Sequence, residues 1–370
     1  MSRRKVVFQV ISHFSVGGAQ QVAINLSKQL IEDTDFHIIT VFKKNIVKGF
    51  SDSIKEDLDK NSIIFHESSV NNSKIGILLL PFRLIYLVLK FRPIVVHAHT
   101  EIPDISIFFF LKYFSFFMPK MRLIRTIHNT VLWSKWEFIG KMVEKYFSMK
   151  GVFTVTISKG VDQSFKKFLN SHNIVLPLMT LIPNGVSEPS KDGKKFDGLV
   201  NQKKNILFAG RFERQKGIEK LCDIILTSSE PNFFHIIGDG SMKDYISTKL
   251  KDMTNFKIHD PYHDLANILH SFDYLVMPSL HEGLPLLTIE SLLAKTPVVA
   301  NNIPGLNETV PPNYPFLVEN NSLEIYNIIF DKKLLPADYE CICNLGYEYA
   351  REEFSLIAMQ KRYNRLFFND

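Results

Sequence analysis

The chain has 370 residues, of which 45% are hydrophobic and 22% are charged. This composition excludes a disordered chain, and the length predicts two domains of ordinary size. The net charge of +6 is uneven: residues 1–170 hold 24 basic and 13 acidic side chains, and the remainder holds 20 and 25. The first half is therefore expected either to meet an anionic partner or to carry a solvated basic face. No zinc-finger spacing or RNP-type strand is present, so no nucleic-acid partner is expected.

The three cysteines include no C-x-x-C pair, which predicts a reducing, cytoplasmic setting. Residues 5–12 fit a buried strand better than a secretory signal. The most apolar segments, residues 75–90 and 105–118, each carry a charge and are shorter than the roughly 20 apolar residues of a spanning helix. We expect both to form buried helices.

Short apolar, β-branched runs alternate with helical patterns along the first half. The predicted strands there are residues 5–12, 36–42, 62–67, 93–99, 122–128 and 152–158. A segment rich in Pro, Gly and Ser, residues 182–205, interrupts the pattern as a linker would. The alternation then restarts, with predicted strands at residues 206–210, 233–238, 256–259, 274–279, 297–300 and 315–318.

Continuous apolar strands separated by helices imply parallel sheets covered on both faces. We therefore predict an α/β chain of two Rossmann-like, doubly wound domains, residues 1–182 and residues 183–354, with a terminal amphipathic helix near residues 355–370. Ligands of such sheets bind at the carboxyl ends of the strands, so the cleft between two such domains is the expected site.

A cationic loop follows the strand that ends at Gly210. The sequence GRFERQKGIEK places Arg211 and Lys216 between this strand and the next helix. Arginine offers a planar fork for phosphate oxygens, lysine offers a compact charge, and a helix N-terminus favours an anion. The loop is either a diphosphate clamp or a pair of solvated cations.

Two other glycine-rich turns lie between predicted strands and helices. Gly238 and Gly240 flank an aspartate, where they allow close backbone approach to a ligand or make a plain turn. Gly17 and Gly18 precede the first predicted helix, where their amides could approach a phosphate or sugar. The letters GGAQQV at residues 17–22 differ from the G-x-G-x-x-G fingerprint, which argues against a nicotinamide or flavin enzyme.

Three histidines cluster at the ends of predicted strands. Strand alternation places His97 and His99 on one face, with His128 at the end of the next strand. A zinc site from the three is conceivable, but no Cys, Asp or Glu completes a recognisable pattern nearby, so no metal is expected. The alternatives are that His128 reaches the cleft or that each histidine is satisfied in the core.

Two glutamates stand eight positions apart in HEGLPLLTIESLLAKTPVVA, residues 281–300. Glu282 reads as a loop residue and Glu290 as a helical one. A fully helical stretch would separate them by about 12 Å along the axis, too far for a hydrolase pair that shares one bond. The spacing suits one extended ligand, such as a nucleotide sugar, held at two points. The alternative is two exposed helix carboxylates.

Several motifs together resemble the retaining glycosyltransferases of family 4, the "glycosyl transferases group 1" with the GT-B fold. They are GGAQQVAINLSKQL, VVHAHT, RTIHNT, VTISKGV, LIPNGV, GRFERQKGI, IIGDGSMKDYI, MPSLHEGLPLLTIESLLAKTPVVANNIPGLNETV and FSLIAMQKRYNRLF. The resemblance covers nearly the whole chain. Lys295 stands where the family often has glycine, at an expected helix end where left-handed geometry costs a lysine only modestly.

The resemblance implies a role for each matching residue. Glu282 would contact the hydroxyls of the donor sugar, Glu290 would hold the ribose, and Arg211 and Lys216 would bind the diphosphate. His128 would face the donor sugar from the first domain. The other implied donor-binding residues are Gly17, Gly18, Gly210, Gly238, Gly240, Gly283, Leu284 and Pro285.

The resemblance also implies a retained glycosidic configuration, no required metal or other cofactor, an acceptor bound mainly by the first domain, and a C-terminal helix that returns to that domain. We expect a hexosyltransferase that moves a sugar from a UDP-sugar, or a GDP-sugar, to a hydroxyl of a lipid-linked saccharide in bacterial surface polysaccharide synthesis. The alternatives are a nucleotide-sugar 2-epimerase and a non-catalytic nucleotide-sugar-binding subunit.

Residues 130–150 mix aromatic side chains with lysines. These side chains are Trp133, Trp136, Phe138, Lys135, Lys141, Lys145 and Lys150. Aromatic side chains beside lysines suit an anionic membrane surface, so this segment predicts peripheral binding to the inner face of the cell membrane. The alternative is a core helix with one solvated face.

Overall fold

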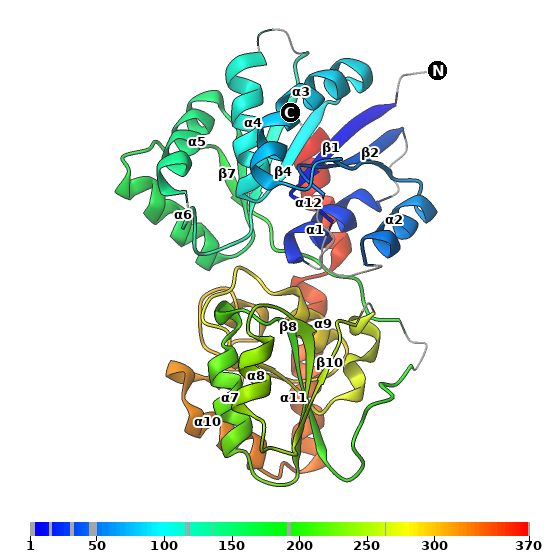
Figure 1. Ribbon diagram of the computed structural model, residues 1–370, viewed down its shortest axis with the longest axis vertical. Coiled ribbons are helices and arrows are strands. Elements are labelled where there is room, and N and C mark those ends of the chain that lie inside the picture. Colours follow the sequence, from blue (N-terminus) through cyan, green and yellow to red (C-terminus); the bar gives the residue numbers. More distant parts are fainter. Residues whose placement is uncertain are drawn as a thin grey trace. The chain divides into compact units, whose positions relative to one another are not determined.

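The computed structural model divides into two compact units (Figure 1). The first is Met1–Gly185 with Leu356–Asp370, and the second is Val186–Ser355. The structure describes residues 4–14, 17–29, 33–43, 50–114, 116, 119–134, 136–190, 194–262 and 264–368. The corresponding boundaries predicted from the sequence are residues 182 and 354.

The first unit is built on a parallel sheet of seven strands in the order β3-β2-β1-β4-β5-β6-β7. The strands are β1 (Lys5–Ile11), β2 (Thr34–Thr40), β3 (Ile64–His66), β4 (Val95–His99), β5 (Arg122–Ile127), β6 (Phe153–Thr156) and β7 (Met179–Leu181). The helices are α1 (Gly18–Ser27), α2 (Phe50–Lys60), α3 (Ser73–Phe91), α4 (Glu101–Phe114), α5 (Glu137–Lys150), α6 (Lys159–Ser171) and α12 (Leu356–Phe368). The central strands β1 and β4 are buried almost throughout, as the continuous apolar runs predict.

Two apolar clusters cover the two faces of this sheet. One joins strand residues such as Phe8 and Val96 to α3, α4 and α5, and the other joins Ile11 and Ile38 to α1 and α2. The burial of both faces confirms the doubly wound arrangement that the sequence predicts.

The C-terminal helix α12 packs against the first unit. The Tyr363 hydroxyl lies 2.8 Å from Thr126 Oγ1 on β5, and Gln360 Nε2 donates to the Asn25 carbonyl at 2.9 Å. Arg122 Nη1 also donates to the Leu366 carbonyl at 2.6 Å. These contacts confirm that the chain returns to its first domain after completing the second.

The second unit has a parallel sheet of six strands in the order β10-β9-β8-β11-β12-β13. Its strands are β8 (Lys204–Arg211), β9 (Asn232–Asp239), β10 (Phe256–His259), β11 (Tyr274–Met277), β12 (Val298–Asn301) and β13 (Leu317–Val318). Its helices are α7 (Ile218–Thr227), α8 (Lys243–Lys249), α9 (Leu286–Leu293), α10 (Leu323–Asp331) and α11 (Pro336–Glu353). Its short 3₁₀ helices are η2 (Arg214–Lys216), η3 (Leu265–Ser271), η4 (Asn307–Thr309) and η5 (Glu319–Asn321).

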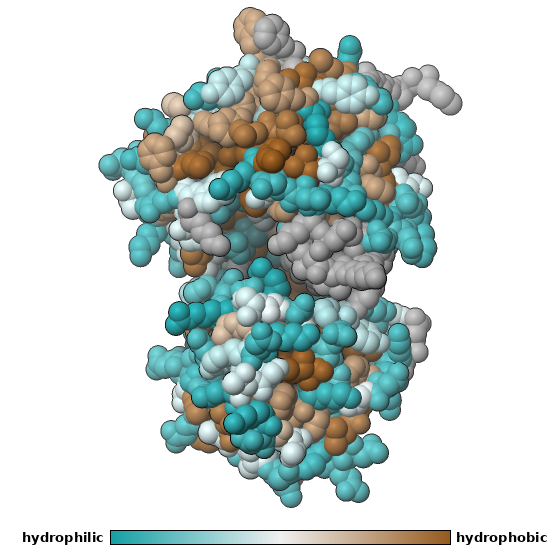
Figure 2. Space-filling view, in the orientation of Figure 1, coloured by the Kyte–Doolittle hydropathy of each residue, from teal (hydrophilic) through white to brown (hydrophobic). Residues whose placement is uncertain are grey.

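The two most apolar helices differ in burial. Most of α4 is buried, as expected, but the expectation of a buried helix is wrong for one side of α3. Leu78 and Phe82 on that side are 61% and 60% exposed. Figure 2 shows apolar residues gathered over the part of the first unit where Figure 1 draws α3 and α4. No helix in the described part of the chain is long and apolar enough to cross a bilayer.

A buried charge cluster corrects one expectation for residues 130–150. Arg125 on β5 pairs with Glu144 on α5 and with Asp104 on α4 at 3.3 Å, and burial raises the pKa of Asp104 to about 7. The Trp133 indole donates to Glu144 at 2.9 Å and is 2% exposed. Trp133 therefore cannot insert into a membrane surface. Lys135 lies outside the described residues.

Candidate functional site

The carboxyl ends of β8 and β9 approach each other closely. Gly210 and Gly238 are register partners with φ of 152° and 149°, a region that favours glycine. A Cβ on Gly238 would lie 2.0 Å from the Gly210 carbonyl oxygen. Gly240, at φ 157°, is equally confined, because its Cβ would lie 2.7 Å from the backbone of Phe212. These glycines let β8, whose last residue is Arg211, end in a tight turn.

The cationic loop after β8 is attached to the loop after β11. Gln215 Nε2 donates to the His281 carbonyl at 2.9 Å, and the Leu280 amide donates to the Gln215 carbonyl at 2.9 Å. Gly217 ends η2 at φ 71°, where a Cβ would lie 2.0 Å from the Pro278 carbonyl oxygen. This contact fixes the position of Lys216, the last residue of η2.

Lys216 and Glu282 form an ion pair at this junction. Lys216 Nζ lies 2.7 Å from Glu282 Oε1, and the two side chains are only 18% and 7% exposed. The Arg211 side chain, by contrast, is exposed and makes no hydrogen bond or ion pair with the described residues. The structure thus brings Lys216 and Glu282 together and leaves the Arg211 guanidinium available to a ligand.

Neighbouring buried residues fix the conformation of the loop that carries Glu282. Gly283, Leu284 and Pro285 are buried, and Pro285 caps α9 while its carbonyl accepts from Thr288 Oγ1 at 2.7 Å. Gly305, at φ 83°, lies so close that a Cβ there would come within 2.3 Å of the Gly283 carbonyl oxygen. The loop therefore presents Glu282 from a backbone with little room to move.

Glu290 lies within α9, which confirms that one glutamate is in a loop and the other in a helix. Its side chain is half-buried, and burial raises its pKa from 4.5 to about 7. No hydrogen bond or ion pair to this carboxyl occurs within the residues that the structure describes. The group can therefore bind hydroxyls of a ligand that enters the site.

Two of the three predicted histidines, His99 and His128, are hydrogen-bonded to each other, whereas His97 Nε2 lies 2.8 Å from Thr126 Oγ1. His99 Nε2 lies 2.8 Å from Gln9 Oε1, and His99 Nδ1 lies 3.2 Å from His128 Nε2. Because an amide oxygen only accepts, His99 carries its proton on Nε2, and its bare Nδ1 accepts from His128 Nε2–H. His128 Nδ1 is then a buried acceptor, and it has no partner among the described residues.

Burial also sets the charge of these rings. It lowers the pKa of His128 to about 3 and that of His99 well below its ordinary value. His128 is therefore neutral at physiological pH. Within the described ranges, no group of three or more His, Cys, Asp or Glu side chains is arranged to hold a metal.

The glycines near the N-terminus open α1. Gly17 is the N-cap, with φ −122°, and Gly18 is the first helical residue. No side chain caps the helix, and its first turn holds no acidic residue, so its amides suit an anionic or hydroxylated ligand. Residues 15–16 lie outside the described part of the chain.

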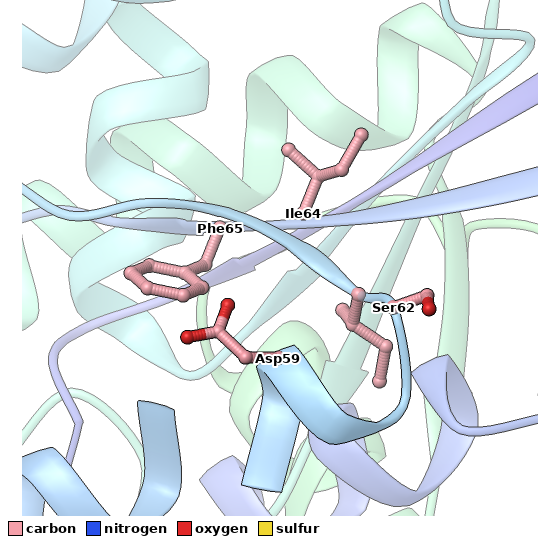
Figure 3. A pocket seen from close by; sticks show the side chains of 5 residues that line it. Asp59, Ser62, Ile64 and Phe65 are labelled. Atoms are coloured by element: carbon pink, nitrogen blue, oxygen red, sulfur yellow. The ribbon is translucent and has the colours of Figure 1, made fainter. Parts of the chain in front are cut away.

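A hollow in the surface of the first unit is unrelated to these residues. It is lined by Asp59, Ser62, Ile63, Ile64 and Phe65, where the turn after α2 leads into β3 (Figure 3). None of the residues predicted to bind the donor lines it.

Two family models match the chain, one to each unit. The model described as "Glycosyltransferase Family 4" matches residues 16–188, and "Glycosyl transferases group 1" matches residues 190–328. The chain belongs to the group 1 glycosyltransferases. It is accordingly a transferase enzyme, and its fold is that of the GT-B class.

Relatives of this glycosyltransferase match from about half to most of its length. An uncharacterized glycosyltransferase of Methanocaldococcus jannaschii is 26% identical over 329 residues, which is 86% of this chain and 85% of the relative. The O-antigen biosynthesis glycosyltransferase WbnH of Escherichia coli is 27% identical over 203 residues, which is 54% of this chain and 55% of WbnH.

Solved structures show the same fold. A glycosyltransferase from Rickettsia africae superposes with a TM-score of 0.76 at 20% identity, covering 99% of this chain and 100% of that one. Anabaena HepE, in complex with UDP and glucose, gives a TM-score of 0.79 at 14% identity and covers 98% of this chain and 99% of that one.

Some residues that shape the site are not marked by any pattern in the sequence. Gly305 backs the Glu282 loop, and Gln9 sets the tautomer of His99 and His128. Both act through contacts between segments far apart in the chain, and no local pattern marks either of them. The pairing of Lys216 with Glu282 is not visible in the sequence for the same reason.

Proposed function

We propose that this glycosyltransferase moves a hexosyl unit, with retention of configuration, from a UDP-sugar to a hydroxyl of a saccharide acceptor. The observation that carries the proposal is the Lys216–Glu282 ion pair at the carboxyl end of the second sheet, with the exposed Arg211 at the end of β8. A cation paired with a carboxylate, and a second cation at the end of the same sheet, suit a ligand that joins a diphosphate to a polyol. Crystallographic binding of UDP and glucose by the similarly folded HepE supports a UDP-sugar, with a GDP-sugar as the other option.

Each part of the donor has a matching group. Arg211 and Lys216 bind the diphosphate through charge-assisted hydrogen bonds. Glu290 accepts from the ribose hydroxyls, and Glu282 accepts from hydroxyls of the sugar. The Glu282 carboxylate therefore has two roles, because it contacts the sugar and also positions the lysine that contacts the phosphate.

His128 and Gly18 serve the donor from the first unit. His128 Nδ1 accepts a hydrogen bond from a hydroxyl of the sugar, since this nitrogen is unprotonated and lacks a partner among the described residues. With a pKa lowered to about 3, the ring acts as a neutral acceptor and not as a general acid. The first-turn amides of α1, which begins at Gly18, approach the donor.

The chemical step follows from these assignments. The bond between the sugar C1 and the β-phosphate oxygen breaks while the acceptor oxygen bonds to C1 on the same face. The acceptor proton passes to the departing phosphate oxygen. Arg211 and Lys216 stabilise the negative charge that develops on the leaving diphosphate, so the proposed reaction requires no metal ion.

The acceptor in this proposal is a lipid-linked saccharide of a bacterial surface polysaccharide, met at the inner face of the cell membrane. The similarity to an O-antigen biosynthesis glycosyltransferase supports a polysaccharide product. Phe138, 77% exposed on α5, and the exposed Lys141 and Lys145 suit a membrane surface, although Trp133 does not contribute.

A thermal-shift screen of UDP-, GDP- and ADP-sugars tests the donor assignment. We expect one UDP-sugar to raise the melting temperature more than UDP alone. Transfer to a saccharide acceptor, with the anomeric configuration of the product read by NMR, then tests retention. Conversion of the donor sugar without acceptor would show an epimerase instead, and binding without turnover would show a non-catalytic subunit.

A further inference from the structure

Helix α3 has two apolar faces. One face packs into the core through residues such as Leu80, Leu84 and Val88. The opposite face, called here the outer face of α3, is between 43% and 61% exposed at Ile75, Leu78, Leu79, Phe82, Tyr86 and Leu89. These residues recur every three or four positions, which places them along one stripe of the helix. Exposed apolar surface this continuous marks an interaction site.

The end of α4 extends this surface. The Phe82 ring lies 5.5 Å from that of Phe114, in an edge-to-face contact. Next to Phe114, Tyr113 is 60% exposed, and Phe116 is 91% exposed. Figure 2 shows a broad apolar area over the part of the first unit where Figure 1 draws these helices. The outer face of α3 is therefore part of a wider apolar surface.

Cations border the outer face of α3, and none lies in its middle. Lys74 is exposed at one end of the helix, and Lys90 and Arg92 are exposed at the other. Arg83, halfway along α3, turns away from this face and donates to the Thr40 carbonyl at 3.1 Å. The sequence from Ser73 to Thr100 contains no acidic residue. An apolar stripe with cationic ends is complementary to a surface that is apolar inside and anionic at its rim.

We propose that the outer face of α3 docks this glycosyltransferase onto a lipid bilayer that contains anionic lipids. Its apolar side chains enter the boundary between headgroups and acyl chains, while Lys74, Lys90 and Arg92 meet the anionic headgroups. The Tyr86 hydroxyl, which accepts from Lys90 Nζ at 3.3 Å, provides a polar tip at that depth. The helix lies flat, because its other face is fixed in the core.

A second copy of the chain fits this face less well than a bilayer does. In a two-fold symmetric contact the same patch faces itself. An antiparallel pair of α3 helices would bring Lys74 of one copy to Lys90 and Arg92 of the other, and a parallel pair would align identical lysines. Either arrangement places like charges together, whereas anionic headgroups neutralise both ends of the helix.

The inference rests on the proposed function in one respect: docking on the bilayer would bring the enzyme to a lipid-linked acceptor. Flotation of the full chain with vesicles of phosphatidylcholine, with and without phosphatidylglycerol, tests it at low and high salt. We expect binding that requires phosphatidylglycerol and weakens with salt. The double variant Leu78→Ser/Phe82→Ser should bind about tenfold or more weakly, since each change removes a large apolar group from the contact.

The matched control is Ile328→Ser/Leu335→Ser in the second unit, at positions that are 57% and 68% exposed. It should bind vesicles like the unaltered chain, and far-UV circular dichroism should show both variants folded. Lys90→Gln/Arg92→Gln should lose most of the dependence on phosphatidylglycerol. Equal loss of binding in the α3 variant and in Ile328→Ser/Leu335→Ser would overturn the assignment.

Two further measurements distinguish a bilayer from a second copy of the chain on this face, and distinguish failure of the docking inference from failure of the proposed function. The inference would be overturned if the chain does not bind vesicles but forms a dimer, and if light scattering shows that Leu78→Ser/Phe82→Ser is a monomer. The outer face of α3 would then contact a second copy of the chain. Binding of the UDP-sugar should be the same in the α3 variant and the unaltered chain. If no nucleotide sugar binds while α3-dependent vesicle binding persists, the proposed function fails and the docking inference stands.

Discussion

Lys216 Nζ lies 2.7 Å from Glu282 Oε1, and this ion pair joins the loop after β8 to the loop after β11. The two side chains come from segments 66 positions apart in the sequence, and both are mostly shielded from water. The carboxylate therefore sets the position of the amine before a ligand arrives. In the proposed function, this arrangement makes Glu282 contribute to phosphate binding as well as to sugar binding.

Glu282→Gln should lower turnover by about a hundredfold while weakening donor binding by less than about tenfold. The amide retains the size of the side chain but removes the charge that holds Lys216, so the leaving diphosphate is stabilised less well in the transition state. Turnover from initial rates and donor affinity from calorimetry check this. Glu219→Gln is the control, since Glu219 is in the same region and pairs loosely, at 3.6 Å, with exposed Arg214. Equal effects of the two changes would contradict the role of Glu282.

Arg211→Ala should reduce turnover by about two orders of magnitude, because a guanidinium aimed at the diphosphate is lost. Arg214→Ala provides a matched control from the same loop, since Arg214 is 81% exposed and pairs with Glu219. Steady-state kinetics with saturating donor, and calorimetric binding of UDP, separate the two variants. Near-normal transfer by Arg211→Ala would refute the assignment of this residue to the diphosphate.

Gly238→Ala should destabilise the protein by about 3 kcal/mol or more, because the new Cβ meets backbone and the φ angle favours glycine. Gly151→Ala measures the effect of an unfavourable φ angle without a steric contact. Gly151 has φ 67°, and a Cβ added there would meet no other atom within 4 Å, so only about 1 kcal/mol of backbone strain is expected. Urea denaturation followed by circular dichroism measures both. Similar losses of stability in the two variants would show that the close approach of β8 and β9 does not add to the cost of a Cβ at Gly238.

The Glu290 carboxyl should make stability depend on pH. Burial raises its folded-state pKa from 4.5 to about 7, so the unfolded chain releases this proton first. Stability should therefore fall as pH rises from about 4.5 to about 7 and stay lower above that range, by about 1 to 3 kcal/mol. Glu290→Gln should remove this component, which urea denaturation at a series of pH values can detect.

The same group should couple pH to donor affinity. Ribose hydroxyls donate to an ionised carboxylate, so the affinity for UDP should rise as pH passes through about 7. Glu290→Gln should bind UDP more weakly and with a flatter pH profile in calorimetry. A pH profile identical to that of the unaltered protein would mean that Glu290 does not contact the ligand.

Removal of divalent metals should leave transfer largely intact. In the proposed reaction Arg211 and Lys216 supply the positive charge that a metal provides in other enzymes. Initial rates after dialysis against EDTA, compared with rates after magnesium or manganese is restored, check this. Loss of turnover with EDTA and its recovery with metal would show that the two cations do not suffice.

Regular patterns predicted the elements of the fold well. The β-branched runs became parallel strands, and the break after residue 182 lies close to the boundary between Gly185 and Val186. Lys295 adopts φ 58° just after α9, the left-handed conformation expected at that helix end. These features depend on a few neighbouring residues, and a local pattern records them directly.

Burial was harder to predict. A helix as apolar as α3 suggests complete burial, yet its outer face is exposed because the sheet has room to cover only one side of it. Trp133 suggests an interfacial anchor, yet its indole bonds to Glu144 in the core. Composition alone does not distinguish an apolar side chain in a core from one awaiting a partner.

The sequence by itself determined the class of the chain, its two α/β units, and the loop and helix that carry Glu282 and Glu290. It did so because strand alternation, helix periodicity and glycine turns follow from short-range sterics. Only the tertiary structure decided that Lys216 pairs with Glu282, that Gln9 sets the tautomer of His128, and that α3 keeps an apolar face uncovered. Those relationships join residues far apart in the chain, and they exist only once packing brings the segments together.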